Sequence, residues 1–260
     1  MRITLGITAA LLLLGAGIPQ GTTPGTPQPR LYCGTDQSGF NSMNGQLAVV
    51  RTNGPQTISP IKIFNLNFPL NGITATPDFL LAGQPEDVGG ARGNIWRELS
   101  LSLTAPALLR TIPPGSNSFS SSCCNEQMVA VGDGTFYHAH YGDVIQQIFI
   151  DSAGQSEVLK NFKQSDVVGM ATDGVQFWIT NWDLHQVGTW DPATNTFTVV
   201  FTTPADAGAL AWDTANGVLW VGMLGGSVIP YDATGKQLGP GFQPFGSISN
   251  TVDGLAFVPE

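Results

Sequence analysis

Apolar residues in this chain form short runs that are separated by residues typical of turns. Three of the runs begin alike, at Met128-Val129-Ala130, Gly169-Met170-Ala171 and Ala209-Leu210-Ala211, and these starts lie 41 and 40 residues apart. The middle start is followed by the turn Asp173-Gly174 and by an aromatic and β-branched run at residues 177–180, as expected of half-buried strands. A period of about 40 residues built from short strands predicts the blades of a β-propeller.

Two further runs of the same kind lie outside this central region. Gly72-Ile73-Thr74 opens a longer repeat, whereas Gly254-Leu255-Ala256 is followed by only a few residues. Strands predicted at residues 46–51 and 61–66 have no first strand of their own, so we expect the last run to pair with them. The sequence therefore predicts an all-β fold, a β-propeller of five blades closed by pairing of its N- and C-terminal strands. Six blades are the alternative, if residues 31–40 supply a further strand.

Aspartates recur at the same places in successive repeats, with spacings of 40 or 41 residues. They are Asp133, Asp173 and Asp213 in one series and Asp151, Asp191 and Asp232 in the other. Their neighbours are turn residues, and an aspartate in a hairpin accepts hydrogen bonds from backbone amides, so we expect structural turns at these positions.

The repeat has a recognisable order: a Gly-apolar-Ala strand, an Asp-Gly turn, a strand with aromatic residues, and an Asp-Pro or Asp-Ala turn. This order resembles the NHL and YVTN-type β-propeller repeats, best over residues 128–240 and less closely at 72–112 and 254–259. The resemblance implies a fold. It implies no activity, because such repeats occur in enzymes, ligand binders and scaffolds alike.

Residues 1–17 have the pattern of a secretory signal peptide. Arg2 is followed by an apolar stretch that contains Leu11-Leu12-Leu13-Leu14, and small residues occupy positions 15–17. The stretch is short for a membrane span. We therefore expect an exported protein, periplasmic, cell-surface or extracellular, that is not an integral membrane protein after signal cleavage; an uncleaved anchor is the alternative. Residues 18–30 are expected to be a Pro/Gly/Thr-rich leader and residues 31–260 a single propeller domain.

The charge balance excludes one class of partner. Nineteen acidic residues face ten basic ones, which gives a net charge of −9, and Lys and Arg form no run. A protein that binds nucleic acid needs clustered basic residues, so nucleic acid is not an expected partner.

Three cysteines are present, and their pairing is open. In an exported protein we expect Cys33 to pair with either Cys123 or Cys124. A disulfide between the adjacent Cys123 and Cys124 and a fully reduced set are the alternatives.

Ligands of propellers usually bind at one mouth of the central channel. Asn125, Asp166 and Asp206 each stand at one register, three positions before a first strand, with Thr251 completing the set. Carboxylate and amide oxygens that converge on an axis could hold calcium, which takes six to eight oxygen ligands. The alternative is that these residues bond backbone amides at turns.

Other polar and aromatic residues are expected at the same mouth. The full set of candidate ligand-binding residues is Asn125, Glu126, Tyr141, Asp143, Asp166, Asn181, Trp182, Asp183, His185, Asp206 and Asp253. Exposed aromatic rings at Tyr141 and Trp182 would suit a stacking platform or a protein anchor.

His138 and His140 alternate on one strand and form a second candidate metal site. A His-x-His pair can ligate zinc, with Asp143 or Glu126 as a third ligand. The alternative is a pair of core histidines.

These features lead to three hypotheses about function. The first is an exported propeller that binds a small molecule or a protein partner at the channel mouth without catalysis of its own. The second is a calcium-assisted hydrolase, lactonase or lyase that uses the aspartates. The third is a structural envelope or surface-assembly component. The sequence establishes no cofactor; calcium is the leading candidate, and zinc at His138 and His140 is the other metal considered.

Overall fold

The computed structural model describes residues 29–35, 44–52, 54–55, 58–68, 70–84, 95–101, 106–112, 125–140, 144–246 and 251–259. Cys123, Cys124, Tyr141, Asp143 and the side chain of Asn125 lie outside this description. The described residues form nineteen strands in five antiparallel sheets.

Each sheet is one blade, whose strands follow one another outward from the axis. Blade 1 consists of β19 (Gly254–Val258), β1 (Arg30–Thr35), β2 (Gln46–Thr52) and β3 (Ile58–Asn65). Blade 2 consists of β4 (Ile73–Ala75), β5 (Phe79–Gln84), β6 (Ile95–Ser100) and β7 (Leu108–Ile112). Blade 3 consists of β8 (Asn125–Gly132), β9 (Thr135–His140), β10 (Val144–Ile150) and β11 (Ser156–Lys163). Blade 4 consists of β12 (Met170–Thr172), β13 (Phe177–Asn181), β14 (Gln186–Asp191) and β15 (Thr196–Thr202). Blade 5 consists of β16 (Ala207–Asp213), β17 (Val218–Met223) and β18 (Val228–Tyr231).

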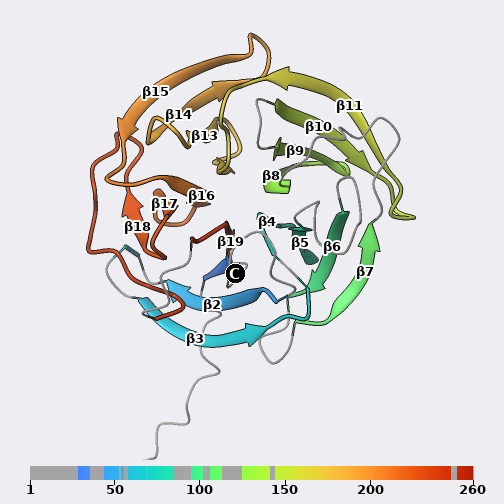
Figure 1. Cartoon of the computed structure of the whole chain (residues 1–260), viewed down its shortest axis with the longest axis horizontal. Coiled ribbons are helices and arrows are strands. Elements are labelled where there is room, and N and C mark those ends of the chain that lie inside the picture. The colour runs from blue at the N-terminus through green and yellow to red at the C-terminus, as the bar shows by residue number, and fades with distance from the viewer. Residues whose placement is uncertain are drawn as a thin grey trace, which may run out of the picture.

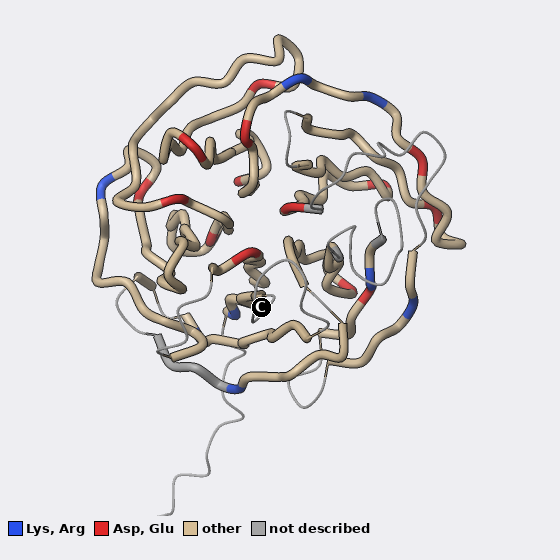
Figure 2. Tube along the Cα trace, in the orientation of Figure 1, with Lys and Arg blue, Asp and Glu red and all other residues tan. Residues whose placement is uncertain are grey.

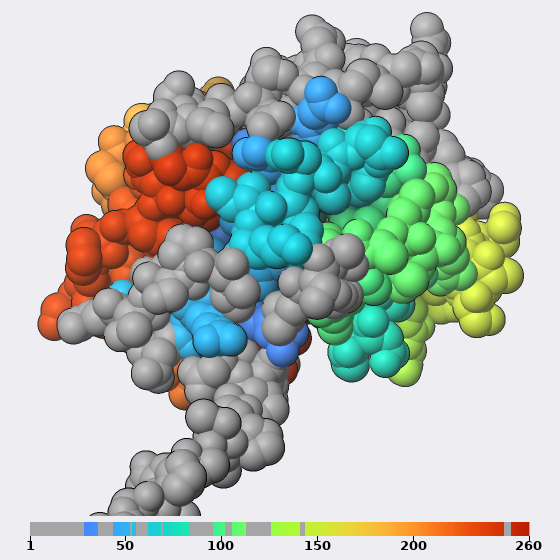
Figure 3. Space-filling model, turned by 90° about the horizontal axis from the view of Figure 1, so that it is seen from below, coloured from blue at the N-terminus to red at the C-terminus, as the bar shows by residue number. Residues whose placement is uncertain are grey.

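The blades stand in a ring around one axis, with one short strand of each blade innermost (Figure 1). The five-bladed all-β propeller that the sequence predicted is confirmed. Its predicted closure is confirmed too, because β19 pairs with β1 in a register that places Leu255 opposite Cys33. Seen from the edge of the disc, the orange-red residues before position 246 lie beside the blue and cyan strands of blade 1 (Figure 3).

Small residues near the axis allow the inner strands to approach closely. A Cβ atom on Gly254 would lie 2.7 Å from the backbone of both Asn71 and Ile73, in the neighbouring blade. Real Cβ atoms do not tolerate such a distance, so only glycine fits at this crowded position.

The sequence pattern aligned Met128 of the third repeat with Gly169 of the fourth, and this alignment is wrong by one residue. Met128 pairs with His138 on the second strand of blade 3, as Met170 pairs with Ile179 in blade 4. Gln127, and not Met128, therefore occupies the position of Gly169. The sequence pattern misaligned this repeat because a long polar side chain stands where the other blades have glycine or alanine.

The recurring aspartates form turns, as predicted. Asp213 Oδ1 accepts hydrogen bonds from the amides of Ala215 and Asn216, both at 3.0 Å. Asp151, Asp173, Asp191 and Asp232 accept backbone amides in their own turns. Asp133 has a φ of 52°, a left-handed conformation that suits a tight hairpin.

Each blade packs one face against the next blade, and a large ring fills most of these contacts. In each blade one equivalent position on the second strand pairs with a residue of the inner strand, namely Ala256, Thr74, Val129, Ala171 and Ala211 in blades 1 to 5. This position carries Tyr32, Leu81, Tyr137, Trp178 and Trp220 respectively. Four of these residues are aromatic and pack on the following blade. Leu81, in blade 2, is the exception.

The Cys33 thiol is free and fully buried in β1, where it packs in the apolar cluster between blades 1 and 5. The predicted disulfide to Cys33 is therefore not formed in this structure, since apolar side chains of blades 1 and 5 enclose the thiol on the face of the sheet. A Cys123–Cys124 disulfide lies outside the described residues and stays a prediction. Burial raises the pKa of the Cys33 thiol.

No helix in the described part of the chain is long and apolar enough to cross a membrane.

Candidate binding face at the channel mouth

Two predicted site aspartates occupy equivalent places at one end of the ring. The carbonyl of Asp166 accepts the amide of Trp182 at 2.8 Å, and the carbonyl of Asp206 accepts the amide of Leu224 at 2.9 Å. In each case the residue that enters a blade is tied to the loop between the second and third strands of that blade. The predicted register thus brings crossings and loops together at the mouth.

The side chains of His185 and Asp206 are in contact across the boundary between blades 4 and 5. His185 Nε2 lies 2.6 Å from Asp206 Oδ1, and 46% of the histidine side chain is exposed against 21% of the aspartate. His185 has a φ of 53° and Asp166 a φ of 55°, both in the left-handed region. Non-glycine residues adopt this region at a cost, and such strain gathers at functional sites.

Apolar side chains surround this pair. Leu184 is 60% exposed and Leu224 is 47% exposed, and Trp182 is half-buried. A Cβ on Gly208 would lie 3.3 Å from Trp182 Cζ3 and 3.0 Å from Thr251 Cγ2, so the indole ring lies over the start of blade 5.

We call Trp182, Leu184, His185, Asp206 and Leu224 the mouth patch. Its residues are linked, because Leu184 adjoins His185 in sequence, the His185 side chain contacts Asp206, and the backbone amide of Leu224 donates to the Asp206 carbonyl. The sequence pattern also places Leu224-Gly225-Gly226 in a loop at the mouth but does not indicate Leu184, although its place in the loop that carries Trp182 could have indicated it.

The remaining predicted mouth residues have different surroundings. Asn181 is buried and holds its loop, since its Nδ2 donates to Ser165 O at 3.1 Å and its Oδ1 accepts Leu184 N at 2.9 Å. Asp183 is exposed, Glu126 is 5% exposed, and the backbone amide of Asp253 donates to Gly34 O at 3.0 Å. Asn181 therefore has a structural part in the loop, while Asp183 faces solvent beside the mouth patch.

The side chain of Gln127 closes the axis beneath the mouth. Its Oε1 accepts the amides of Leu210 at 2.6 Å and of Met170 at 3.2 Å. Its Nε2 donates to Leu255 O at 2.5 Å and to Leu210 O, with Ile73 O at 3.4 Å. Beyond this amide, the inner strands enclose a cavity of about 100 Å³. The Gln127 side chain therefore blocks the path of a ligand from the mouth along the central axis.

His138 and His140 are both fully buried. The ring of His138 packs edge-on against Trp96 at 5.5 Å and against His140 at 5.9 Å. Its nitrogens make no hydrogen bond of normal geometry, although Gln146 is its cross-strand neighbour. Burial, and then the adjacent His140, lower the pKa of His138 to about 3, and Gln146 opposes the shift.

The metal hypotheses stay predictions. Among the residues that the structure describes, no three His, Cys, Asp or Glu side chains lie close enough together to hold a metal ion. Two of the predicted ligands, Asp143 and the side chain of Asn125, lie outside the described residues.

Charges are distributed unevenly between the centre and the rim of the disc. Lys and Arg are concentrated on the outer strands, with Lys62 on β3, Arg110 on β7 and Lys160 on β11, whereas acidic residues approach the axis (Figure 2). The inner strands β4, β8, β12, β16 and β19 contain neither Lys nor Arg. The mouth is therefore poor in positive charge.

No protein-family model and no curated protein matches this sequence. A chain in the crystal structure of a nidogen/laminin complex is similar, with 14% identity, a TM-score of 0.54, and coverage of 89% of this chain and 98% of that one. Glutaminyl cyclase from Myxococcus xanthus is 15% identical with a TM-score of 0.49, over 68% of this chain and 76% of that one. At 14% identity, the likeness to the nidogen/laminin chain shows the β-propeller fold alone.

Proposed function

We propose that this chain is an exported β-propeller that binds a protein partner through the mouth patch, without catalysis of its own. The observation that carries the proposal is the exposure of Leu184 and Leu224 on the mouth loops of adjacent blades, which the contact between His185 and Asp206 connects. Apolar anchors around a polar pair are typical of protein interfaces.

The energetics favour a protein surface as the occupant. Burial of an exposed leucine in a complex contributes about 1–2 kcal/mol, so two leucines with the half-buried Trp182 supply a core for an interface. Because Gln127 closes the axis, the mouth offers a broad face and no deep central channel. The acidic surroundings favour a partner with apolar residues flanked by basic ones.

The similar chain of known structure comes from a complex of two proteins, nidogen and laminin, which accords with this proposal. We also propose that the blades are of the NHL and YVTN type. The support for this assignment is the Gly-apolar-Ala start and the aspartate turns over residues 128–240.

Site-specific photo-crosslinking tests the proposal. A benzoylphenylalanine is placed at position 184 or 224, and the protein is expressed in its source cells and irradiated. We expect discrete adducts of one partner at both positions. The matched control is position 175, because Val175 is 89% exposed in the hairpin before β13, at the opposite end of that strand from Leu184.

A second measurement checks that the side chains themselves bind. The double variant Leu184→Ser/Leu224→Ser should lose co-purification of the crosslinked partner and keep the parent melting temperature, since both leucines are exposed. Equal adducts from position 175, or none from 184 and 224, would show that the mouth patch is not the interface.

A further inference from the structure

A second cavity lies between blades 2 and 3, at the end of the ring opposite the mouth patch. It lies where Leu81 stands at the position that carries a Tyr or Trp in the other four blades, while Trp96 of β6 packs elsewhere in the same contact between blades. Leu81 shares an apolar cluster with Phe136 and Ile150 of blade 3, and these three side chains line the cavity.

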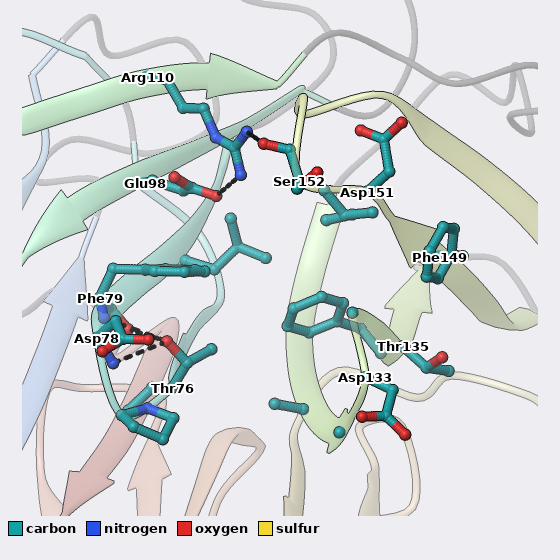
Figure 4. Close-up of a pocket in the computed structure, with 18 residues that line it drawn as sticks. Thr76, Asp78, Phe79, Glu98, Arg110, Asp133, Thr135, Phe149, Asp151 and Ser152 are labelled. Atoms are coloured by element: carbon teal, nitrogen blue, oxygen red, sulfur yellow. Dashed lines mark hydrogen bonds and ion pairs between the residues drawn. The ribbon is translucent and has the colours of Figure 1, made fainter.

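The cavity is large enough for an organic molecule. Its volume is about 820 Å³, within the range of about 300–1,000 Å³ that is usual for small-molecule sites. Phe79 of blade 2 and Phe149 of blade 3 lie on opposite sides of it, and the hairpins before β5 and β9 border its inner end (Figure 4). Phe136 also lines it.

A partly buried ion pair lies at its outer end. Arg110 Nη2 contacts Glu98 Oε1 at 2.5 Å, and 8% of the glutamate side chain is exposed. Arg110 Nη1 donates to Ser152 O at 2.9 Å, which joins blade 2 to blade 3 (Figure 4). The arginine thus holds the two blades together beside the cavity while its charge is balanced by Glu98.

The charge that remains around the cavity is negative. Asp78, Glu98, Asp133 and Asp151 line it together with Arg110, so four carboxylates face one guanidinium, a net charge of −3. Carboxylates next to aromatic rings attract a cation that also has an apolar body, since the rings add cation–π attraction.

From these observations we infer that the cleft between blades 2 and 3 is a binding site for an organic amine with an aromatic or aliphatic body. The body occupies the space that the missing ring leaves beside Leu81, and the ammonium group lies among the carboxylates. This site is separate from the mouth patch and does not depend on the function proposed there.

Three probes with the same body and different charge test the inference. They are 2-(1-naphthyl)ethylamine, the corresponding neutral alcohol, and 1-naphthylacetate, each titrated into the purified protein by calorimetry at low salt. We expect saturable binding of the amine, with affinity at least about tenfold weaker for the alcohol and weaker still for the acid.

Filling the cavity should abolish binding without unfolding the protein. Leu81→Trp introduces the kind of ring that the other four blades carry, so we expect the melting temperature to stay the same or rise and amine affinity to fall by at least about tenfold. Leu81→Phe is the second variant if the larger ring prevents folding.

Removal of charge should weaken binding selectively. Asp133→Asn is expected to lower amine affinity about threefold, in a manner that added salt reduces. Asp173→Asn is the matched control, because it lies in the equivalent hairpin of blade 4 and away from the cleft. No saturable amine binding, equal binding by a folded Leu81→Trp or Leu81→Phe variant, or tighter binding of the acid would overturn the inference.

Discussion

The amide of Gln127 connects its own inner strand to the inner strands of the other four blades. The residues that it contacts, Ile73, Met170, Leu210 and Leu255, belong to β4, β12, β16 and β19. Nε2 has two hydrogens for three carbonyls, so the 3.4 Å contact to Ile73 shares a donor with a closer one. This one side chain therefore satisfies backbone groups of several blades at once.

Gln127→Met should therefore destabilise the protein by about 3 kcal/mol, because the buried amides of Met170 and Leu210 lose their acceptor. Urea unfolding measures the change. Gln176→Met is the control, since Gln176 is exposed and its substitution should cost less than about 0.5 kcal/mol. Equal stability of the two variants would contradict the role of Gln127 at the axis.

His138 makes stability depend on pH. Its pKa is about 3 in the folded protein and near 6.5 when unfolded, so the unfolded chain binds the proton first as pH falls. The contribution of the neutral His138 to the free energy of unfolding is fully present above pH 6.5. It is lost progressively as the pH falls from 6.5 to about 3. We expect the parent to lose about 2 kcal/mol more than His138→Leu when urea unfolding is compared at pH 7.5 and pH 5. Identical losses in the two proteins would contradict a buried neutral histidine.

Asp206→Asn distinguishes an ion-paired aspartate from a calcium ligand. Without a metal the substitution removes the contact with His185, and we expect a small loss of less than about 1 kcal/mol, because the histidine is 46% exposed. An empty calcium site would instead gain stability when one of its like charges is removed. Thermal melts of parent and variant, with calcium and with a chelator, separate the two outcomes.

At the residue scale, the sequence predicted the hydrogen bonds within turns. It did not predict the side-chain contacts between blades. The amides that Asp191 and Asp213 accept lie within three residues, so the turns could be read from neighbouring positions. The partners of Gln127 lie 43 to 128 residues away, and no local pattern indicates them. The pairing of His185 with Asp206 was likewise hidden, although both were expected at the mouth.

At the scale of strands and blades, the pattern of short apolar runs predicted five blades and the pairing of β19 with β1. It did not predict the cleft between blades 2 and 3. Leucine is an ordinary buried residue in a strand, and Leu81 becomes informative only when it is compared with the aromatic residues that fill the other contacts. That comparison requires the exact pairing of strands, which a register error of one residue would have obscured.

Loss of β19 should remove the cooperative fold. Deletion of residues 254–260 leaves β1 without its inner partner and exposes the apolar face on which Leu255 and Ala256 pack. We expect the urea transition to lose its sharpness and a hydrophobic dye to bind. Deletion of residues 259–260 alone is the control, because it leaves β19 intact. A truncated protein that melts within a few degrees of the parent would refute the closure.

At the scale of the whole molecule, the net charge of −9 is arranged with basic residues outside and acidic residues nearer the axis. Both proposed sites gain from this arrangement. The mouth patch attracts a partner with basic residues at its rim, and the cleft on the opposite end attracts an amine. Added salt should weaken both interactions, since exposed charges are screened within about 10 Å at 0.1 M ionic strength.

The proposed export is a further prediction at the scale of the whole molecule. We expect the mature protein to begin shortly after residue 17, because the apolar stretch is followed by small residues. Mass spectrometry of the exported protein measures its N-terminus, and Leu12→Arg/Leu13→Arg should leave the full-length precursor inside the cell. Exported protein that begins at Met1 would contradict signal cleavage.

The accessibility of the Cys33 thiol depends on the pairing of β1 with β19. During synthesis β1 emerges long before its inner neighbour, so the edge that later faces Leu255 stays open and the thiol stays accessible. Once β19 docks, the same sulfur is enclosed and its ionisation is suppressed. Alkylation of Cys33 therefore reports the order of folding, because only molecules exposed to the reagent before ring closure are modified at this residue.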